Sequence, residues 1–341
     1  MPCPVTAARL VPFVLPLRAP LRLATGVLAE RRGVLLRLDD GDGHIGWGEC
    51  APFPGLSPDT AATAEASLRA WIDTGDDAGL PPAARAAVDG ARLDLDAQRR
   101  SVSLARALAP NAAPTVPLAA LLAGDDAAVV ETAEAVRRAG YRAAKLKVGG
   151  RPLADDVRRI HTVADALGSD VLLRLDANRA WSFDDARRVA DALAGLAVDY
   201  LEEPLADAAR LPEFAAETGV RVALDESLAS IDGPTALGGH GYAHAVVLKP
   251  LVLGGVGRAL AWGRAALAAG MTPVVSSAFE SGVGTRLALA LAAALGDTAP
   301  PAPAGLDPYG HLATDVLAPR LPLDRPVVDV EAALAGSHVA V

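Results

Sequence analysis

An apolar run near the middle of the chain, Arg142-Ala143-Ala144-Lys145-Leu146-Lys147-Val148, ends in two lysines. Further runs follow at intervals of about 25 residues, each with a charged residue at its end: Asp176, Glu202, Asp225 and Lys249. Stretches with helical spacing lie between the runs, for example 182–193, which Ser182 can open as N-cap. Strands that alternate with helices at this period build a parallel barrel. We therefore predict an α/β fold with a modified (β/α) barrel of the TIM type, whose charged strand ends meet at one centre.

Three of the strand-end residues are carboxylates: Asp176, Glu202 and Asp225. Carboxylates that converge repel one another unless a cation lies among them. An all-oxygen set without His or Cys suits a hard divalent ion, and three protein ligands leave positions open for water and a substrate carboxylate. We predict a Mg²⁺ site on these residues, with Mn²⁺ as a substitute.

The lysines point to the chemistry. Lys145 and Lys147 stand two apart on one strand, so their side chains share a face about 6–7 Å apart. A neighbouring ammonium and a nearby cation lower the pKa of a lysine, which makes it usable as a general base. Lys249 approaches from the far side of the barrel. Opposed lysines around a metal suit removal of a proton α to a carboxylate, with the resulting enediolate stabilised by the metal.

At these residues the chain resembles the enolase superfamily, in particular its muconate-cycloisomerase-like group and, within it, the o-succinylbenzoate synthases. The resemblance covers nearly the whole chain. The matched motifs are K-x-K at Lys145-Leu146-Lys147, D-x-N at Asp176-Ala177-Asn178, E-E/Q-P at Glu202-Glu203-Pro204, the third ligand motif at Asp225-Glu226-Ser227, and the lysine of the sixth strand at Lys249.

The resemblance implies a lyase that dehydrates 2-succinyl-6-hydroxy-2,4-cyclohexadiene-1-carboxylate to o-succinylbenzoate, a step of menaquinone biosynthesis. Lys147 would be the acid/base beside Lys145, and Lys249 would stay charged on the other face of the substrate. Ser hydroxyls and Gly amides at strand ends can hold a carboxylate, so Ser276, Ser277 and Gly305, together with Asn178, are the expected substrate contacts.

Two further residues are expected to support the site from behind. Arg174 lies two positions before Asp176 and should face inward, where it is either a partner of the site carboxylates or a packing residue. Glu226, like Glu203, follows a metal-ligand candidate directly and is interpreted as a supporting or structural acid.

The remaining length predicts further parts. The chain has 341 residues, whereas a bare barrel needs about 250. We expect an N-terminal α+β capping domain over 1–112, the barrel over 113–312, and a C-terminal segment over 313–341 that packs back on the capping domain. The capping domain is predicted to contain strands at 10–23, 34–38 and 44–49, helices at 58–72 (N-cap Ser57) and 83–108, and family-like specificity loops at 23–28 and 48–55, whose Gly and Pro content suits mobile lids.

Other functions stay open at this point. A racemase of N-acylated amino acids, such as N-succinylamino acids, would use Lys147 and Lys249 on opposite faces of the α-carbon, and the motifs do not separate it from a synthase. A muconate cycloisomerase is a further alternative. Dipeptide epimerases need an acid where Gly305 stands, and mandelate-type members need a seventh-strand His that is absent. A non-catalytic carboxylate-binding barrel would have lost a lysine or a ligand, and none is lost.

Composition excludes several classes of protein. The net charge is −9 and the basic residues are dispersed, which argues against nucleic acid as a partner. Without an apolar run of about 18 residues or a signal-peptide pattern, we expect no membrane partner and a cytoplasmic location.

The cysteines, histidines and one glycine turn are interpreted as minor features. Cys3 and Cys50 fit a reducing compartment. His240 and His244 are read as loop residues, and Gly254-Gly255-Val256-Gly257 as a tight turn rather than a nucleotide site. The expected partner is a small-molecule carboxylate, with a homo-oligomer as an open alternative.

Overall fold

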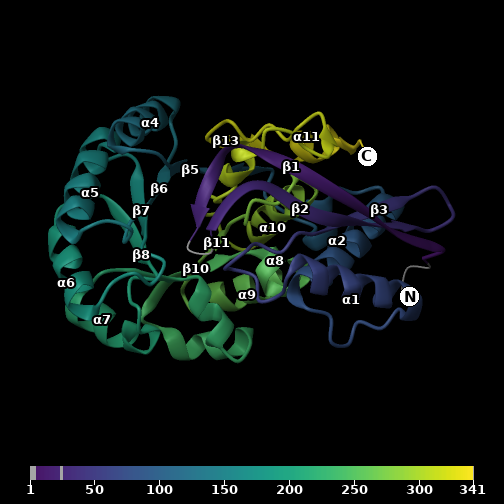
Figure 1. Cartoon of the computed structure of the whole chain (residues 1–341), viewed down its shortest axis with the longest axis horizontal. Helices are drawn as coiled ribbons and strands as arrows, with labels where there is room; N and C mark the ends of the chain where they lie inside the picture. Colours follow the sequence, from purple (N-terminus) through teal and green to yellow (C-terminus); the bar gives the residue numbers. More distant parts are fainter. Residues whose placement is uncertain (1–4, 24–25, 341) are drawn as a thin grey trace.

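The middle part of the sequence folds into a barrel of parallel strands with helices on its outer face (Figure 1). The computed structural model describes residues 5–23 and 26–340. The sheet order is β11-β10-β9-β8-β7-β6-β5, which confirms the predicted α/β barrel. Its strands are β5 (Ala119–Leu122), β6 (Ala143–Lys147), β7 (Leu172–Asp176), β8 (Val198–Glu202), β9 (Val222–Leu224), β10 (Ala243–Leu248) and β11 (Thr272–Val275).

Residues 304–305 take the place of an eighth strand and close the barrel. Ala304 forms a parallel bridge with Leu118, just before β5, and Gly305 forms one with Ser276, just after β11. This segment is short, because Asp307 already begins a 3-10 helix, η4 (Asp307–His311).

The strand register aligns the charged ends. Lys147 pairs with Asp176, and Asp176 pairs with Glu202, at the last residues of β6, β7 and β8. Side chains that leave neighbouring parallel strands at the same level lie side by side. The regular spacing of the charged residues in the sequence therefore places Lys147, Asp176 and Glu202 at one end of the barrel.

Helices follow the barrel strands and cover the outside of the sheet. Ser182 caps α6 by accepting a hydrogen bond from the backbone N–H of Asp185, as predicted. None of the helices in the described part of the chain is long and apolar enough to cross a membrane. The helices are α4 (Asp126–Ala139), α5 (Leu153–Leu167), α6 (Phe183–Ala192), α7 (Leu211–Thr218), α8 (Pro250–Leu253), α9 (Val256–Ala268) and α10 (Gly282–Leu295), with short 3-10 turns η1 (Ala208–Arg210), η2 (Glu226–Ser230) and η3 (Pro234–His240).

The N-terminal part is an antiparallel sheet of β1 (Ala7–Leu23), β2 (Gly26–Asp39) and β3 (Ile45–Cys50), packed on α1 (Ala61–Thr74) and α2 (Pro82–Arg99). The prediction that the second strand starts at residue 34 is wrong. Strand β2 pairs with β1 from Gly26 onward, through the charged run Glu30-Arg31-Arg32 that breaks the apolar pattern. Most of the expected loop at 23–28 is thus strand, while positions 24–25 lie outside the described residues.

Both predicted helices of this part need correction. Helix α1 is capped by Thr60, whereas the hydroxyl of Ser57 accepts from the N–H of Phe53 at 2.9 Å. The single helix expected over 83–108 is two, because Ser101 takes a φ of 53° that ends α2. A short helix, α3 (Leu104–Leu108), then starts from the cap Ser103.

The C-terminal segment contacts both earlier parts of the chain. Strand β13 pairs with β4, and β12 pairs with β14. The N–H of Ala313 donates to the carbonyl of Pro16 at 2.8 Å, and Arg106 donates to Glu331 at 3.1 Å. The elements are β4 (Thr115–Pro117), β12 (Leu317–Ala318), β13 (Val327–Asp329), α11 (Val330–Ala335) and β14 (His338–Val339).

Three minor sequence features have structural places. Cys50 is buried and free, and burial raises the pKa of its thiol, while Cys3 lies outside the described residues. His240 ends η3 and His244 lies in β10, so they share no helix face. Gly255 lies in a tight turn between α8 and α9, where a Cβ would come within 2.5 Å of Asp89.

A buried charged cluster joins the N-terminal sheet to the barrel. The loop expected at 48–55 begins later, because β3 runs to Cys50. The guanidinium of Arg31 donates to the carbonyls of Ala51 and Pro52 in this loop and to that of Phe279 beyond β11. Glu49 accepts from the N–H groups of Ser281 and Gly284 at the start of α10. Burial raises the pKa of Glu280 to about 7, and the charge of Glu49 adds to this.

This cluster predicts that stability falls as pH rises. The folded-state pKa of Glu280 lies above its ordinary value of 4.5, so its stabilising contribution is present at low pH and is lost as pH passes through about 7. We expect Glu280→Gln to remove on the order of 2–4 kcal/mol of this dependence, measured as the free energy of unfolding in urea at pH 5 and pH 8. Glu134→Gln on α4, a half-buried acid paired with Arg138 and far from this cluster, is the control. Equal pH slopes for wild type and Glu280→Gln would contradict the prediction.

Candidate active site

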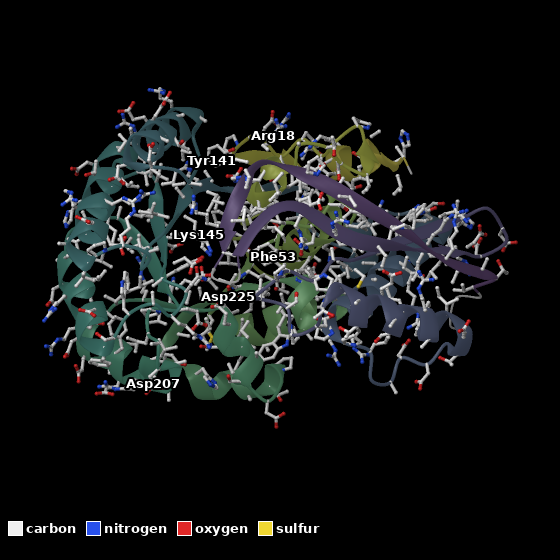
Figure 2. The ribbon with its side chains drawn as sticks, in the orientation of Figure 1. Arg18, Phe53, Tyr141, Lys145, Asp207 and Asp225 are labelled. Carbon is white, nitrogen blue, oxygen red and sulfur yellow. The ribbon has the colours of Figure 1, made fainter. Side chains whose placement is uncertain are left out.

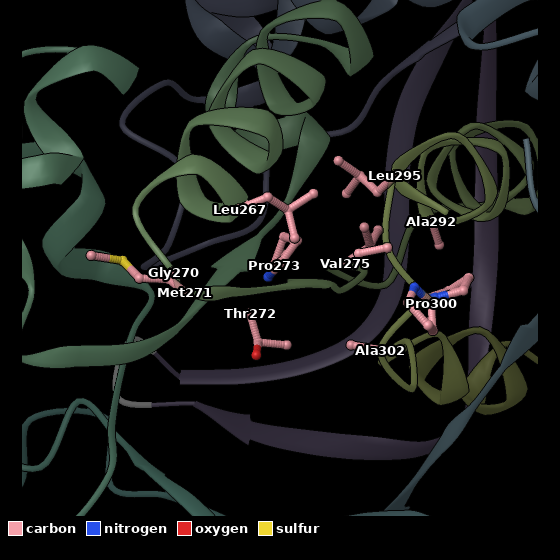
Figure 3. Close-up of a pocket in the computed structure, with 12 residues that line it drawn as sticks. Leu267, Gly270, Met271, Thr272, Pro273, Val275, Ala292, Leu295, Pro300 and Ala302 are labelled. Carbon is pink, nitrogen blue, oxygen red and sulfur yellow. The ribbon is translucent and has the colours of Figure 1, made fainter. Parts of the chain in front are cut away.

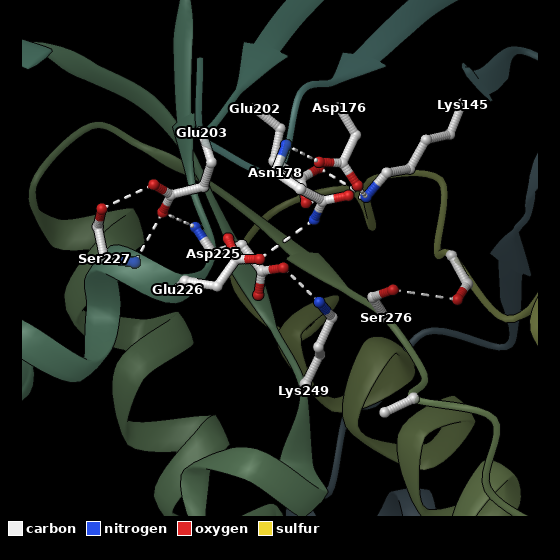
Figure 4. A network of polar contacts seen from close by, with 12 residues as sticks. Lys145, Asp176, Asn178, Glu202, Glu203, Asp225, Glu226, Ser227, Lys249 and Ser276 are labelled. Atoms are coloured by element: carbon white, nitrogen blue, oxygen red, sulfur yellow. Dashed lines mark hydrogen bonds and ion pairs between the residues drawn. The ribbon is translucent and has the colours of Figure 1, made fainter. Parts of the chain in front are cut away.

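The carboxyl ends of five neighbouring barrel strands bring the predicted catalytic groups together (Figure 4). Lys145 comes from β6, Asp176 from β7 and Glu202 from β8, while Asp225 and Lys249 directly follow β9 and β10. Figure 2 shows Lys145 and Asp225 near the middle of the molecule, where the N-terminal part meets the barrel. The lysines of β6 and β10 thus approach the carboxylates from opposite strands of the barrel.

Each carboxylate has an ammonium partner. The Nζ of Lys145 lies 2.8 Å from Oδ2 of Asp176 and 2.8 Å from both carboxylate oxygens of Glu202. Lys249 donates to Oδ2 of Asp225. Asp176 and Glu202 are 2% and 0% exposed, so their charges are desolvated and need these partners.

Burial and mutual repulsion perturb the acids and bases of the centre. Burial and the charge of Asp176 raise the pKa of Glu202 to about 8. Burial opposes charge on Lys145, yet Asp176 and Glu202 outweigh it and raise its pKa well above 10.5. The two carboxylates therefore favour the charged form of the Lys145 side chain. The lowered lysine pKa expected from the sequence supposes a bound metal ion and stays a prediction.

The donor set fits a hard divalent cation once the ammonium groups move aside. Within residues 5–23 and 26–340, no three His, Cys, Asp or Glu side chains form a ready metal cluster. The contacts above give the reason: the oxygens of Asp176 and Glu202 converge on the Nζ of Lys145, which stands where a cation would be coordinated. All donors are carboxylate oxygens, the ligands that Mg²⁺ and Mn²⁺ prefer.

Lys147 is held in a different way. Its Nζ donates to Oδ1 of Asn178 at 3.0 Å, and Nδ2 of Asn178 donates to Oε1 of Glu226 at 3.1 Å. A carboxylate accepts only, so Glu226 fixes the amide with its oxygen toward Lys147. Asn178, predicted as a substrate contact, is thus also a partner of the predicted base. The other oxygen of Glu226 is buried and accepts no hydrogen bond from residues 5–23 and 26–340.

Arg174 faces inward as predicted but contacts other groups. Its guanidinium donates to Asp199 at 2.9 Å and to the carbonyl of Pro303 at 2.7 Å, and it lies over the ring of Tyr200. Among the contacts of the described residues, its hydrogen bonds go one layer below the site rather than to the site carboxylates. The alternation of side chains along a strand predicted the direction of the Arg174 side chain, whereas its partners lie on other segments of the chain.

The predicted substrate contacts on the last two strands lie together. Ser276 donates to the carbonyl of Gly305 at 3.3 Å, and the buried hydroxyl of Ser277 has no hydrogen-bond partner among the described residues. A buried hydroxyl of this kind is available to a ligand. Phe279, just beyond, stacks on Phe53 of the 48–55 loop with ring centroids 5.5 Å apart, so that loop is packed onto the barrel in this structure.

One apolar cavity lies away from this centre (Figure 3). It has a volume of about 270 Å³ and is lined by residues such as Leu267, Thr272, Pro273 and Leu295. Thr272 begins β11, so the cavity is at the amino ends of the strands. Its lining contains no titratable side chain, and it therefore offers nothing for acid–base chemistry.

Two features of the site were missed at the sequence level. The chain contains only three lysines, Lys145, Lys147 and Lys249, and every other Lys or Arg position is arginine. This count was readable from composition. The second feature is the set of partners of Glu203: the residue was expected to be a supporting or structural acid, but no sequence signal indicated that its fully buried carboxylate links three strand-end loops.

The chain is similar to known proteins over most of its length. A family model described as "Enolase C-terminal domain-like" matches residues 128–334, and one described as "MenC, N-terminal domain" matches residues 5–84. The chain is 33% identical over 320 residues to the o-succinylbenzoate synthase of Pectobacterium atrosepticum, covering 89% of this chain and 91% of that protein. It is 34% identical to that of Thermobifida fusca, covering 83% and 75%.

Solved structures show the same fold. A dipeptide epimerase from Enterococcus faecalis V583, complexed with Mg and the dipeptide L-Leu-L-Tyr, superposes with a TM-score of 0.87 at 23% identity over 98% of this chain and 99% of that one. A muconate lactonizing enzyme from Pseudomonas fluorescens complexed with muconolactone gives a TM-score of 0.85 at 23% identity over 100% and 98%. At this identity the likeness concerns the architecture.

Proposed function

We propose that this chain, which belongs to the enolase superfamily and within it to the o-succinylbenzoate synthases, dehydrates 2-succinyl-6-hydroxy-2,4-cyclohexadiene-1-carboxylate to o-succinylbenzoate in menaquinone biosynthesis. The observation that carries the proposal is a buried group of carboxylates flanked by lysines from opposite barrel strands. Its expected partner is this small carboxylate, and its expected location is the cytoplasm.

Asp176, Glu202 and Asp225 are the proposed holders of Mg²⁺, or of Mn²⁺ in its place. When bound, the ion would supply the positive charge that an anionic substrate and an enediolate require. Lys145 and Lys249 would give up their present contacts with these carboxylates. Ser276, Ser277 and Gly305 are proposed to hold a substrate carboxylate through hydroxyl and backbone groups.

Lys147 is the proposed acid and base. In its neutral form its Nζ takes the proton from the carbon next to the ring carboxylate. The resulting ammonium, held by Oδ1 of Asn178, returns this proton to the departing hydroxyl group, so one C–H and one C–O bond break and water leaves. Since a single group performs both transfers, the elimination is syn.

Lys249 separates this proposal from the racemase alternative. In the synthase it only supplies charge, which agrees with its hydrogen bond to Asp225. In an N-succinylamino acid racemase it must itself exchange a proton with the second face of the α-carbon. The opposed placement of Lys147 and Lys249 serves both reactions, so the decision belongs to experiment.

Removal of divalent cations should abolish dehydration. Without them, carboxylates face an anionic substrate and a developing enediolate with too little positive charge. We expect no turnover after chelation, with recovery on addition of Mg²⁺ or Mn²⁺. Full activity in protein that elemental analysis shows to be metal-free would make the metal assignment wrong.

Replacement of Lys147 should remove activity and leave the fold intact. We expect Lys147→Ala and Lys147→Arg each to lower kcat by about 10²–10⁴-fold, since a guanidinium is permanently protonated and cannot act as a base. Arg151→Ala in the following loop removes a half-exposed cation paired with Asp126 and is the control. Near-normal kcat in Lys147→Ala would assign the base to another residue.

Replacement of Lys249 by arginine should distinguish the two functions. Arginine keeps the charge but cannot exchange a proton, so we expect Lys249→Arg to retain measurable dehydration and to lose any racemisation. For the wild type we expect kcat/KM for dehydration to exceed that for N-succinyl amino acid racemisation, followed by α-proton exchange in D₂O. Racemisation about tenfold faster than dehydration, and lost in Lys249→Arg, would instead favour the racemase.

A further inference from the structure

The carboxylate of Glu203 lies behind the proposed metal ligands. Glu203 follows Glu202, so its side chain leaves the other side of the strand end, and it is 0% exposed. Figure 4 shows it beside Ser227, away from Lys145. A buried carboxylate is costly unless all its acceptor positions are used, so its partners indicate what it does.

Those partners belong to the loops of both neighbouring strands. Oε1 accepts from the backbone N–H groups of Asp225 at 2.8 Å and Ser227 at 2.7 Å. Oε2 accepts from the hydroxyl of Ser227 at 2.8 Å and from Nε of Arg179 at 3.0 Å. Arg179 also donates to the hydroxyl of Ser227, which closes the network. One side chain thus ties the loops after β7 and β9 to the end of β8.

The backbone of this region is held in unfavourable conformations. Asn178, Arg179 and Glu203 have φ values of 42°, 60° and 41°. Such angles are unfavourable for residues other than glycine and persist only where surrounding contacts enforce them. The N–H of Arg179 donates to the carbonyl of Glu203 at 2.7 Å, so backbone and side chain of Glu203 both act on these loops.

We propose that Glu203 is a positioning residue that holds Asp225 in the orientation needed for metal binding. Its bond to the N–H of Asp225 fixes the peptide plane from which that side chain departs. Through Arg179 it also holds the loop that carries Asn178 and follows Asp176. The inference rests on the proposed function, because it takes Asp176 and Asp225 as metal ligands.

A merely structural role would look different in experiment. Any buried carboxylate lowers stability when removed, and the chain offers a matched case in Asp94. Asp94 accepts from the backbone N–H of Trp47 and from Arg286, as Glu203 accepts from backbone groups and Arg179, but it lies between α2, β3 and α10. Asp94→Ala therefore serves as the control for stability lost without effect on the ligands.

The experiment compares Glu203→Ala, Glu203→Gln and Asp94→Ala with wild type by two measurements. The first is Kd for Mn²⁺ by electron paramagnetic resonance, together with Tm of the metal-free protein. Loss of a group that orients a metal ligand raises Kd about 10–100-fold. We expect this for Glu203→Ala, a smaller rise of at least about threefold for Glu203→Gln, which keeps one acceptor oxygen, and none for Asp94→Ala.

The second measurement is amide hydrogen exchange of metal-free protein in the peptide that covers 222–231. We expect faster exchange there in the Glu203 variants and unchanged exchange in Asp94→Ala. If Glu203→Ala does not fold, Glu203→Gln is decisive. A Kd within twofold of wild type, or unchanged exchange at 222–231 in a folded Glu203 variant, would overturn the inference. Failure of the wild type to bind Mn²⁺ would instead overturn the proposed metal site, and the exchange result would then decide on Glu203 alone.

Discussion

Repulsion among three acids at adjacent strand ends is the constraint on which the rest of this site depends. Register places Asp176 beside Glu202, and burial removes the water that would screen them. The protein meets the constraint with ammonium groups from β6 and β10 and with backbone donors behind the acids. The acids of this centre are thus compensated by positive charge from two sides of the barrel.

The same constraint recurs where the N-terminal sheet meets the barrel. Glu49 and Glu280 are buried near one another, and Arg31 supplies the cation between the 48–55 loop and Phe279. Burial raises the pKa values of both acids, so their charged forms are disfavoured where the N-terminal sheet meets the barrel. The position of the loop over the barrel mouth is therefore set by charge as well as by the stacking of Phe53 on Phe279.

The sequence predicted the features that depend on neighbouring residues, but not those that depend on contacts between distant segments. The period of the strands and the face of each side chain follow from chain geometry, which is why Lys145, Asp176 and Glu202 could be brought together in advance. The extent of β2, the break after Arg99 and the partners of Arg174 depend on segments far away in the chain. Glu203 illustrates the limit: its place after Glu202 suggests a supporting or structural acid, while only the structure shows which groups it contacts.

The three lysines of the chain all lie at the candidate active site, so the protein carries side-chain amines at that site alone. A reagent selective for side-chain amines finds no lysine on the outer surface to consume it. Labels, cross-linkers or solid supports attached through lysine would be attached to the reaction centre itself. Immobilisation of this enzyme therefore calls for a handle other than lysine, because its only other amine is the α-amino group at the N-terminus.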